Sequence, residues 1–501
     1  MNDVAAVIWL MALPLLASPV IYLGGRLYMR GTGKTGLARW LAVAALPATC
    51  IPLYFVMHNY QETGSPGIDI GTIFLRVDGI SLLMTIVVLA LGLMVVLFSV
   101  AYMDGEVNEE KYYALLIAMI GSIIGLSCAG DLFNLWVWFE AMAITSYMLV
   151  AFYRDEKSTL EAGVKYLVQS ATGSVLVLLG IALVYAQTGT LQMEEIIVSV
   201  QRGSPLLLAA GAFFLIGFGI KTALVPLHTW LPDAHSQAPS GISAMLSGIV
   251  IEAGLIALLR ALGCLGAAGP NWGVILLVFG ALNMLVGNLM ALRQKEVKRL
   301  LAFSSVSHIG YILLGIGVSV LTLKAGGAAG GFFHLFNHAM MKGLAFLAAG
   351  AFLYVLHLPK DDHSPLVLSD LDGAARRYPV VAFALSVAVL GLGGLPPFSG
   401  FMSKWQIFMA GFNSQNPWIW LVVIFAALNS VLSLAYYAPL VNRLYRHEPS
   451  PVVLAGKPVS LAMILPLVLL VLVIVVLGCW PPLLTWLTGP ASISLMTSFG
   501  L

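Results

Sequence analysis

The sequence has 501 residues, of which 60% are hydrophobic and only 10% are charged, and its formal net charge is +2. A mean hydropathy of +0.95 excludes an ordinary soluble protein, and with it a soluble enzyme. We predict an all-α polytopic membrane protein that is surrounded by a lipid bilayer and has no nucleic-acid partner.

Apolar stretches long enough to cross a hydrocarbon core of about 30 Å recur along the whole chain. We predict about 14 transmembrane helices, near residues 5–25, 36–57, 80–102, 112–130, 132–153, 163–186, 206–224, 240–262, 271–292, 300–320, 328–356, 380–411, 417–440 and 459–482. An even number of spans places both termini on the same side of the membrane.

Basic residues concentrate in the connections that follow the odd-numbered predicted helices. They are Arg26, Arg30, Lys34, Arg39, Arg154, Lys157, Arg293, Lys295, Lys298, Arg299, Lys360, Arg376, Arg377, Arg443, Arg446 and Lys457. The positive-inside rule makes this face cytoplasmic, so both termini are expected outside. The acidic segment 104-DGEVNEEK-111 falls on the same face, but acidic residues have little influence on topology.

The longest hydrophilic stretch, residues 358–377, leaves no room for a soluble catalytic domain. The four cysteines, Cys50, Cys128, Cys264 and Cys479, are far apart and show no disulfide, iron–sulfur or zinc spacing. We therefore expect no cofactor, no metal site and no catalytic site in this chain, and we expect any redox chemistry to belong to another subunit.

Eight ionisable residues fall inside the predicted spans, where a charge is unfavourable unless it faces the bundle interior or water. They are Glu140, Lys221, Glu252, His308, His334, His338, Lys342 and Lys404. Residues of this kind are candidates for an ion pathway.

Two of the predicted spans contain helix-breaking residues. Pro226 follows Lys221 in the seventh span, and Pro396 and Pro397 precede Lys404 in the twelfth. Broken helices are tolerated at membrane depth where protein or water satisfies the freed backbone groups.

The two broken helices occupy the same place in two sets of five. Spans four to eight and nine to thirteen each have a broken fourth member, and an odd number of helices inverts the second set, which indicates an inverted repeat with an ion site near the midplane. We divide the chain into an N-terminal three-helix segment (1–110), a first repeat (111–265), a second repeat (266–445) and a C-terminal helix (446–501).

The segment 331-GFFHLFNHAMMKGLAFLAAG-350 places His334, His338 and Lys342 four residues apart, on one helical face. Because histidine changes charge near neutral pH, this stripe suits a proton relay. A packed polar stripe is the alternative. Zinc would need further ligands, which the sequence does not supply.

The remaining candidates also have two interpretations. Glu140 and Lys221 form either a switchable pair or a structural salt bridge. Lys404 is either functional or a lysine that reaches the membrane surface. Glu252 has no charged neighbour in sequence, and the serines around His308 can satisfy that ring locally.

A further group lies in the connection 228-HTWLPDAHSQAPS-240. His228, Asp233 and His235 either belong to a plain turn between helices or mark the point of proton uptake.

Three segments resemble one family: 226-PLHTWLPDAHSQAPS-240, 298-KRLLAFSSVSHIGY-311 and the histidine–lysine stripe. They are similar to the antiporter-like subunits shared by respiratory complex I, membrane-bound hydrogenases, formate hydrogenlyase and the Mrp sodium/proton antiporters. The resemblance begins near residue 78 and continues to the thirteenth span. The length suggests a medium-sized, D-subunit-like paralogue, and 238-APSGISAMLSGI-249 favours the hydrogenase and Mrp-like branch.

The resemblance implies roles for individual residues. Glu140 and Lys221 match the family's modulating pair, His334 and His338 its eleventh-helix histidines, and Lys404 its residue at the exit end. The family has a central lysine on the eighth helix, where this sequence has Glu252. That difference reverses the local charge and puts proton conduction through the first five-helix repeat in question.

We therefore expect a proton-translocating subunit of a redox-driven pump or of an Mrp-type cation/proton antiporter, in a bacterial or archaeal cell (inner) membrane. A free-standing Na⁺/H⁺ antiporter and a non-conducting structural subunit are the alternatives. Expected partners are other membrane subunits, including antiporter-like paralogues, and a peripheral iron–sulfur, nickel–iron or flavin module is a further candidate.

Overall fold

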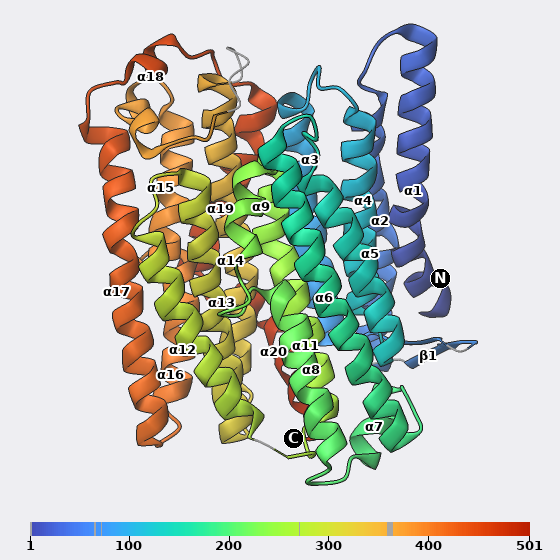
Figure 1. The fold of residues 1–501 in the computed structure, drawn as a ribbon. Coiled ribbons are helices and arrows are strands. Elements are labelled where there is room, and N and C mark those ends of the chain that lie inside the picture. The colour runs from blue at the N-terminus through green and yellow to red at the C-terminus, as the bar shows by residue number, and fades with distance from the viewer. Residues whose placement is uncertain (1–2, 65–66, 72, 270, 358–363) are drawn as a thin grey trace.

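The computed structural model describes residues 3–64, 67–71, 73–269, 271–357 and 364–501. In these ranges the chain is helical apart from connections and one antiparallel hairpin, β1 (Gly67–Ile70) and β2 (Ile73–Arg76), as Figure 1 shows. The predicted all-α polytopic fold is confirmed.

The helices follow one another closely along the chain. They are α1 (Asp3–Thr32), α2 (Leu37–Thr63), α3 (Gly79–Tyr102), α4 (Glu109–Ser127), α5 (Leu132–Val150), α6 (Lys157–Thr188), α7 (Met193–Ser199), α8 (Pro205–Thr222), α9 (Trp230–Gln237), α10 (Ser240–Met245), η1 (Leu246–Val250), α11 (Ile251–Cys264), α12 (Trp272–Ala291), α13 (Val297–Thr322), α14 (Gly326–Leu356), α15 (Pro379–Gly393), α16 (Ser399–Phe412), α17 (Pro417–Arg446), α18 (Pro451–Ala455), α19 (Leu461–Cys479) and α20 (Thr485–Ser498).

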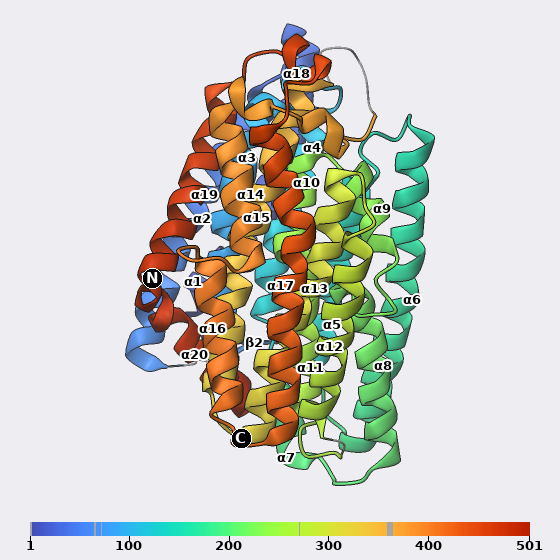
Figure 2. The same cartoon turned by 90° about the vertical axis from the view of Figure 1, so that its left-hand side faces the viewer.

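Within the described ranges, 13 helical segments are long and apolar enough to cross a membrane. One of them is the continuous run of α10, η1 and α11. The helix pair α15 and α16 supplies the remaining predicted crossing in two pieces, and Figure 2 shows α15 above α16 on the same side of the bundle.

Polar side chains mark where several of these helices begin. The side chains of Asp78, Asp131, Ser204, Asn416 and Ser460 accept hydrogen bonds from the first-turn backbone N–H groups of α3, α5, α8, α17 and α19. Such caps satisfy donors that have no partner within the helix, which matters at the edge of an apolar phase.

The seventh and twelfth helices are broken, as the prolines predicted. α8 ends at Thr222 and the chain resumes as α9 at Trp230, while α15 ends at Gly393 and α16 starts at Ser399. Each break leaves the last carbonyl groups of the preceding helix without partners inside that helix.

The connections after odd-numbered spans meet at one end of the bundle. Ser236, which follows the break in the seventh span, donates to Glu296, and Glu296 in turn forms an isolated bridge with Val367. At the opposite end, the hairpin residue Leu75 bridges to Ala129. The basic connections therefore lie on one face, as the sequence predicted; Lys360 lies outside the described residues.

The acidic segment on that face is neutralised within the structure. Arg39 donates to Asp104 at 2.6 Å and to Glu109 at 2.9 Å, and Arg26 donates to Glu110 at 3.0 Å. These pairs join α1 and α2 to α4. The acidic residues thus have a structural role that is compatible with a basic face.

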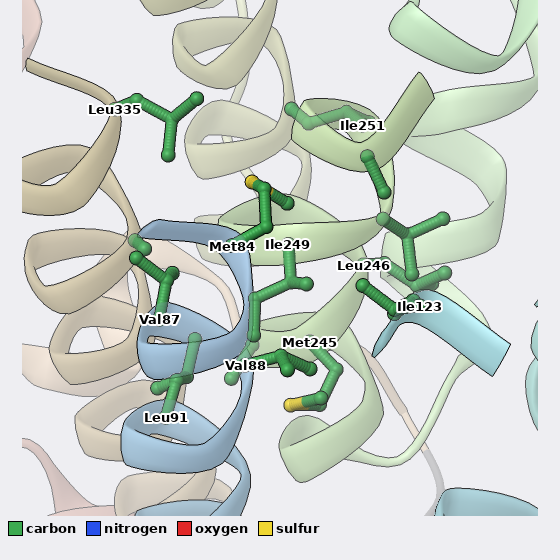
Figure 3. Close-up of a cluster of buried hydrophobic side chains, with 14 of the residues drawn as sticks. Met84, Val87, Val88, Leu91, Ile123, Met245, Leu246, Ile249, Ile251 and Leu335 are labelled. Atoms are coloured by element: carbon green, nitrogen blue, oxygen red, sulfur yellow. The ribbon is translucent and has the colours of Figure 1, made fainter. Parts of the chain in front are cut away.

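The central helices are α11, α13 and α14, whose residues are almost all buried, whereas the outer helices expose apolar side chains such as Leu428 and Val431. Gly248 allows η1 to approach α3 and α14, because a Cβ atom there would lie 2.7 Å from Leu91. Figure 3 shows the apolar contact among Met84, Val87, Val88, Met245, Leu246, Ile249 and Leu335.

The sequence did not predict the hairpin, the π-turn η1 or a second helix after α19. The C-terminal segment contains both α19 and α20, where we expected one helix. α20 folds back beneath α3, and the Gly79 N–H donates to Ser494 Oγ at 3.0 Å. Gly79 is required there, since a Cβ atom would lie 2.2 Å from the Pro490 backbone.

Candidate functional site

Six of the eight candidate residues gather on the central helices α11, α13 and α14 and on the neighbouring α16. Glu252 lies on α11, His308 on α13 and Lys404 on α16, and each has no more than 3% of its surface exposed. His334, His338 and Lys342 lie on α14, which packs between α13 and α16.

Glu252 and His338 are hydrogen-bonded to each other. Glu252 Oε1 lies 2.7 Å from His338 Nδ1, and both side chains are fully buried. The π-turn η1 directly precedes Glu252, and π-turns of this kind often occur at functional sites. In the described structure, Glu252 Oε2 and His338 Nε2 have no hydrogen-bond partner, so each has capacity for a further proton donor or acceptor.

The histidines continue this contact toward α16. The rings of His338 and His308 stack with centroids 5.2 Å apart. His308 Nδ1 lies 3.0 Å from His334 Nε2, and His334 Nδ1 lies 2.8 Å from Ser403 Oγ. Ser403 directly precedes Lys404, so polar groups follow one another from Glu252 to the broken twelfth helix.

Lys342 is held on the other side of the stripe. Its Nζ donates to Leu301 O at 2.7 Å and to Ser304 Oγ, and Tyr437 OH donates to the same Ser304 Oγ at 2.7 Å. One turn of helix separates Lys342 from His338. The stripe predicted from the sequence is therefore real, but its lysine contacts α13 rather than a histidine.

Lys404 binds to polar groups at the break in the twelfth helix. Its Nζ donates to Leu392 O at 2.9 Å and to Ser430 Oγ at 2.8 Å, and it lies 4.5 Å from the centroid of the Tyr311 ring. Leu392 is in the last turn of α15, where free carbonyl groups and the helix dipole favour a cation. Lys404 therefore points inward rather than to the membrane surface.

Lys221 lies in the last turn of α8 and is 1% exposed. Its Nζ donates to Ser146 Oγ at 3.0 Å and to the hydroxyl of Tyr166. The Tyr166 ring stacks on Trp230 of α9 with centroids 4.0 Å apart, so the break between α8 and α9 encloses the lysine. Gly254 makes room for Lys221, because a Cβ atom there would lie 3.1 Å from it.

The expected ion pair between Glu140 and Lys221 is not formed. No pair within 4.0 Å joins these two described residues, and Glu140 is only partly buried on α5. Its Oε1 is enclosed without a hydrogen-bond partner. Lys221 instead donates to the hydroxyl groups of Ser146 and Tyr166, where we expected the carboxylate of Glu140.

Residues 228–240, which follow the break in the seventh helix, lie at the basic end of the helix bundle. Asp233 accepts hydrogen bonds from Arg299 at 2.6 Å and from Lys165 at 3.2 Å. Partial burial acts to raise the pKa of Asp233, but these two cations outweigh it and the pKa is lowered. Asp233 thereby fastens α9 between α6 and α13.

His235 is fully buried two residues later, and neither ring nitrogen has a partner among the described residues. Its ring stacks on Phe346 of α14 at 4.7 Å. The residues that follow His235 in the chain, Ser236 and Gln237, line a cavity of about 80 Å³ together with Lys298, and His235 itself is not part of the lining. His228, with 9% of its surface exposed, contacts Phe303 instead.

Sequence reasoning missed the hydroxyl groups that hold the ionisable residues. They are Ser146, Tyr166, Ser304, Ser403, Ser430 and Tyr437. Serine and tyrosine are common in membrane helices, and their partners lie on distant helices, so no spacing in the sequence identifies them.

No group of three or more histidine, cysteine, aspartate or glutamate side chains in the described ranges is arranged to hold a metal ion. The histidines are instead bonded to one another, to Glu252 and to Ser403.

Comparison with known proteins places this arrangement in a family. Residues 129–430 match the family described as "NADH:quinone oxidoreductase/Mrp antiporter, TM", and residues 68–113 match "NADH-Ubiquinone oxidoreductase (complex I), chain 5 N-terminus". The first match alone covers more than half of the chain.

Individual relatives agree with the family match. The chain is 32% identical over 416 residues to F(420)H(2) dehydrogenase subunit N of Methanosarcina mazei, which covers 81% of this chain and 82% of that protein. It is 31% identical over 497 residues to NADH-quinone oxidoreductase subunit N of Desulforudis audaxviator, with 94% and 95% covered.

A solved structure extends the agreement to the whole fold. A chain of the membrane-bound sulfane sulfur reductase, an archaeal respiratory membrane complex, superimposes with a TM-score of 0.86 at 26% identity and with 99% of both chains covered. The protein is thus a multi-pass membrane protein and belongs to the family of antiporter-like membrane subunits found in NADH:quinone oxidoreductases and Mrp antiporters.

Proposed function

We propose that this subunit translocates protons along the buried line that joins Glu252, His338, His308, His334 and Lys404. The observation that supports it most is the Glu252–His338 hydrogen bond of 2.7 Å, from which stacked and hydrogen-bonded rings lead to Ser403. Carboxyl, imidazole and hydroxyl groups that are hydrogen-bonded can pass protons by short transfers, and a bridging water would carry the proton between the stacked rings of His338 and His308, which share no hydrogen bond.

The Glu252–His338 pair suits this task in a low-dielectric interior. A proton can lie on the carboxylate or on the imidazole without changing the net charge of the pair, which avoids the large penalty of an isolated buried charge. The pair has a net charge of +1 when a second proton arrives and of −1 when both protons leave. Glu252 can therefore replace the family lysine while the position still holds a transferable proton.

Lys221 and its neighbours are the candidate switch that changes the proton affinity of Glu252. Lys221 is held by neutral hydroxyl groups, so a negative charge on or near the partly buried Glu140 would attract it. A shift of this cation changes the electrostatic potential at Glu252, since Gly254 on the same helix is in contact with Lys221. Proton uptake and release can follow from that change.

Lys342 and Lys404 complete the path. Lys342 lies one turn from His338 and donates to Ser304, which also accepts a hydrogen bond from Tyr437, while Lys404 lies at the break in the twelfth helix. We assign Lys404 to the exit end, and we assign proton uptake to His235 and to the cavity that Ser236 and Gln237 line. Asp233, which accepts hydrogen bonds from Lys165 and Arg299, then holds α9 in place at this uptake end.

The basic end of the bundle is proposed to be cytoplasmic, which leaves both termini outside a bacterial or archaeal cell (inner) membrane. Each elementary charge moved against 100 mV requires ~2.3 kcal/mol. The energy would come from an attached iron–sulfur, nickel–iron or flavin module, or from an opposing ion gradient in an Mrp-type complex.

Other membrane subunits, including antiporter-like paralogues, are the proposed partners. Glu140 lies on an outer helix whose neighbours Val137 and Ile144 are exposed and apolar. A carboxylate in that position suits a contact with another subunit better than contact with lipid. Within the family we favour the hydrogenase and Mrp-like branch and a D-subunit-like role.

The test is proton translocation by the purified complex in liposomes, with Lys221→Ala and Lys404→Ala variants. We expect both variants to assemble and to lose coupled translocation. Undiminished translocation in both would favour the non-conducting structural subunit. Translocation by the chain purified without partners would favour the free-standing antiporter instead.

A further inference from the structure

A groove of about 310 Å³ opens between the start of α15 and the start of α19, near the end of the bundle where α18 lies (Figure 1). This size is within the roughly 300–1,000 Å³ typical of small-molecule sites. Its apolar lining comes from Pro379, Val380, Val381, Pro458, Val459 and Ile464. The groove therefore offers a hydrocarbon surface beside the basic connections.

Arg377 stands at the mouth of this groove in a fixed position. Its Nη1 donates to Leu454 O and its Nη2 donates to Gly456 O. The guanidinium Cζ lies 5.8 Å from the centroid of the Tyr378 ring. Because only two of its five N–H donors are used in these bonds, Arg377 retains donors for an anion.

The charge of Arg377 is not neutralised, unlike that of its basic neighbours. Arg376 pairs with Glu448 at 2.8 Å and Arg443 pairs with Asp372 at 2.9 Å. Arg377 forms no such pair with any carboxylate in the part of the chain that the structure describes, and neither does the exposed Lys457. A fixed cation thus lines an apolar groove, and Lys457 directly precedes the lining residue Pro458 in the chain.

We propose that this groove binds an anionic phospholipid. The phosphate would accept hydrogen bonds from Arg377, whose planar guanidinium matches phosphate geometry, and one acyl chain would lie against Val380, Val459 and Ile464. Basic pockets between transmembrane helices bind anionic headgroups in this way. The net positive charge favours an anionic lipid over a zwitterionic one with the same acyl chains.

Native mass spectrometry of the intact complex tests this, with phosphatidylglycerol and phosphatidylcholine of identical acyl chains as probes. We expect Arg377→Gln to weaken phosphatidylglycerol binding about tenfold and phosphatidylcholine binding by a smaller factor, because the choline cation of the second lipid offsets the phosphate charge that Arg377 attracts. Val380→Trp, at a side chain that is 41% exposed, should fill the groove and weaken binding of both lipids. Arg376→Gln removes a paired cation outside the groove and is the matched control.

Equal affinity of the wild-type complex for the two lipids would overturn the proposal, as would equal losses in Arg376→Gln and Arg377→Gln. Binding to the isolated chain that disappears in the assembled complex would show that a neighbouring subunit occupies the groove, and would also contradict it. Because Val380→Trp leaves Arg377 and its backbone contacts in place, it tests the groove even if Arg377→Gln folds poorly.

Discussion

Oε1 of Glu252 lies 2.7 Å from Nδ1 of His338, and neither side chain is exposed. The two residues are 86 positions apart and lie on different helices, α11 and α14. A carboxylate alone at this depth would be strongly unfavourable, whereas a carboxylate bonded to an imidazole is not. At the position where the resemblance implies a lysine, this chain thus has a carboxylate together with a partner that accommodates it.

The link between the histidines and the twelfth helix depends on Ser403. Ser403→Ala removes the hydroxyl 2.8 Å from His334 Nδ1 and should lower proton translocation about tenfold, because the transfer toward Lys404 loses its intermediate. The measurement is the initial rate of acidification in liposomes. Ser386→Ala is the control, since that buried hydroxyl bonds a carbonyl of its own helix and the Tyr445 hydroxyl, and none of the histidines; equal effects of the two would remove Ser403 from the path.

The position of Lys221 depends on a glycine. Gly254→Ala places a methyl group 3.1 Å from Lys221 atoms, which should displace the ammonium group from Ser146 and Tyr166 and lower coupled translocation about tenfold. Because those atoms include the Lys221 backbone carbonyl carbon and the site is buried, we also expect overpacking to lower stability by about 1–3 kcal/mol. Gly326→Ala, where nothing lies within 4 Å, should have no effect on rate. A fully active Gly254→Ala protein would show that Lys221 needs no fixed position.

The N-terminal helices are predicted to depend on one buried arginine. Arg39→Gln should lower the free energy of unfolding by about 1–3 kcal/mol, since Glu109 would remain buried without its cation. Thermal unfolding in detergent measures this. Arg376→Gln breaks an exposed pair and should leave the Tm nearly unchanged. Equal shifts for the two variants would contradict the structural role of the acidic segment.

The contacts by which Asp233 holds α9 in place should stabilise the protein less at low pH. Because the pKa of Asp233 is lowered in the folded protein, its contribution to stability is present at neutral pH and is lost as the pH falls through that folded-state pKa. Asp233→Asn should therefore lower the Tm at pH 7 and have less effect near pH 3. Glu161→Gln, at a more exposed partner of Lys165, is the control. A Tm difference that stays constant with pH would exclude this role.

Much of the fold was predictable because lipid imposes simple rules. Helix lengths, the two proline breaks and the basic face all follow from hydropathy, backbone chemistry and charge. The π-turn before Glu252 and the close approach of α20 at Gly79 were not predictable, since both depend on packing between segments far apart in the sequence.

The site was predictable only in part for the same reason. The sequence identified Glu252, His334 and Lys404 as candidates because these ionisable residues fall inside predicted membrane spans. The pairing of Glu252 with His338, and the hydroxyl contacts of Lys221 in place of Glu140, required the three-dimensional arrangement. The sequence determines which groups can titrate, while helix packing determines which of them touch.

The most direct measurement is proton translocation by the purified complex carrying Glu252→Gln, which keeps the size of the side chain and removes its titratable proton. We predict normal assembly and a translocation rate lowered at least about tenfold. His338→Gln should cause a similar loss, and the double variant should be little worse than either, because the two residues act as one unit. A Glu252→Gln complex that translocates protons at the wild-type rate would contradict the proposed path through the Glu252–His338 pair.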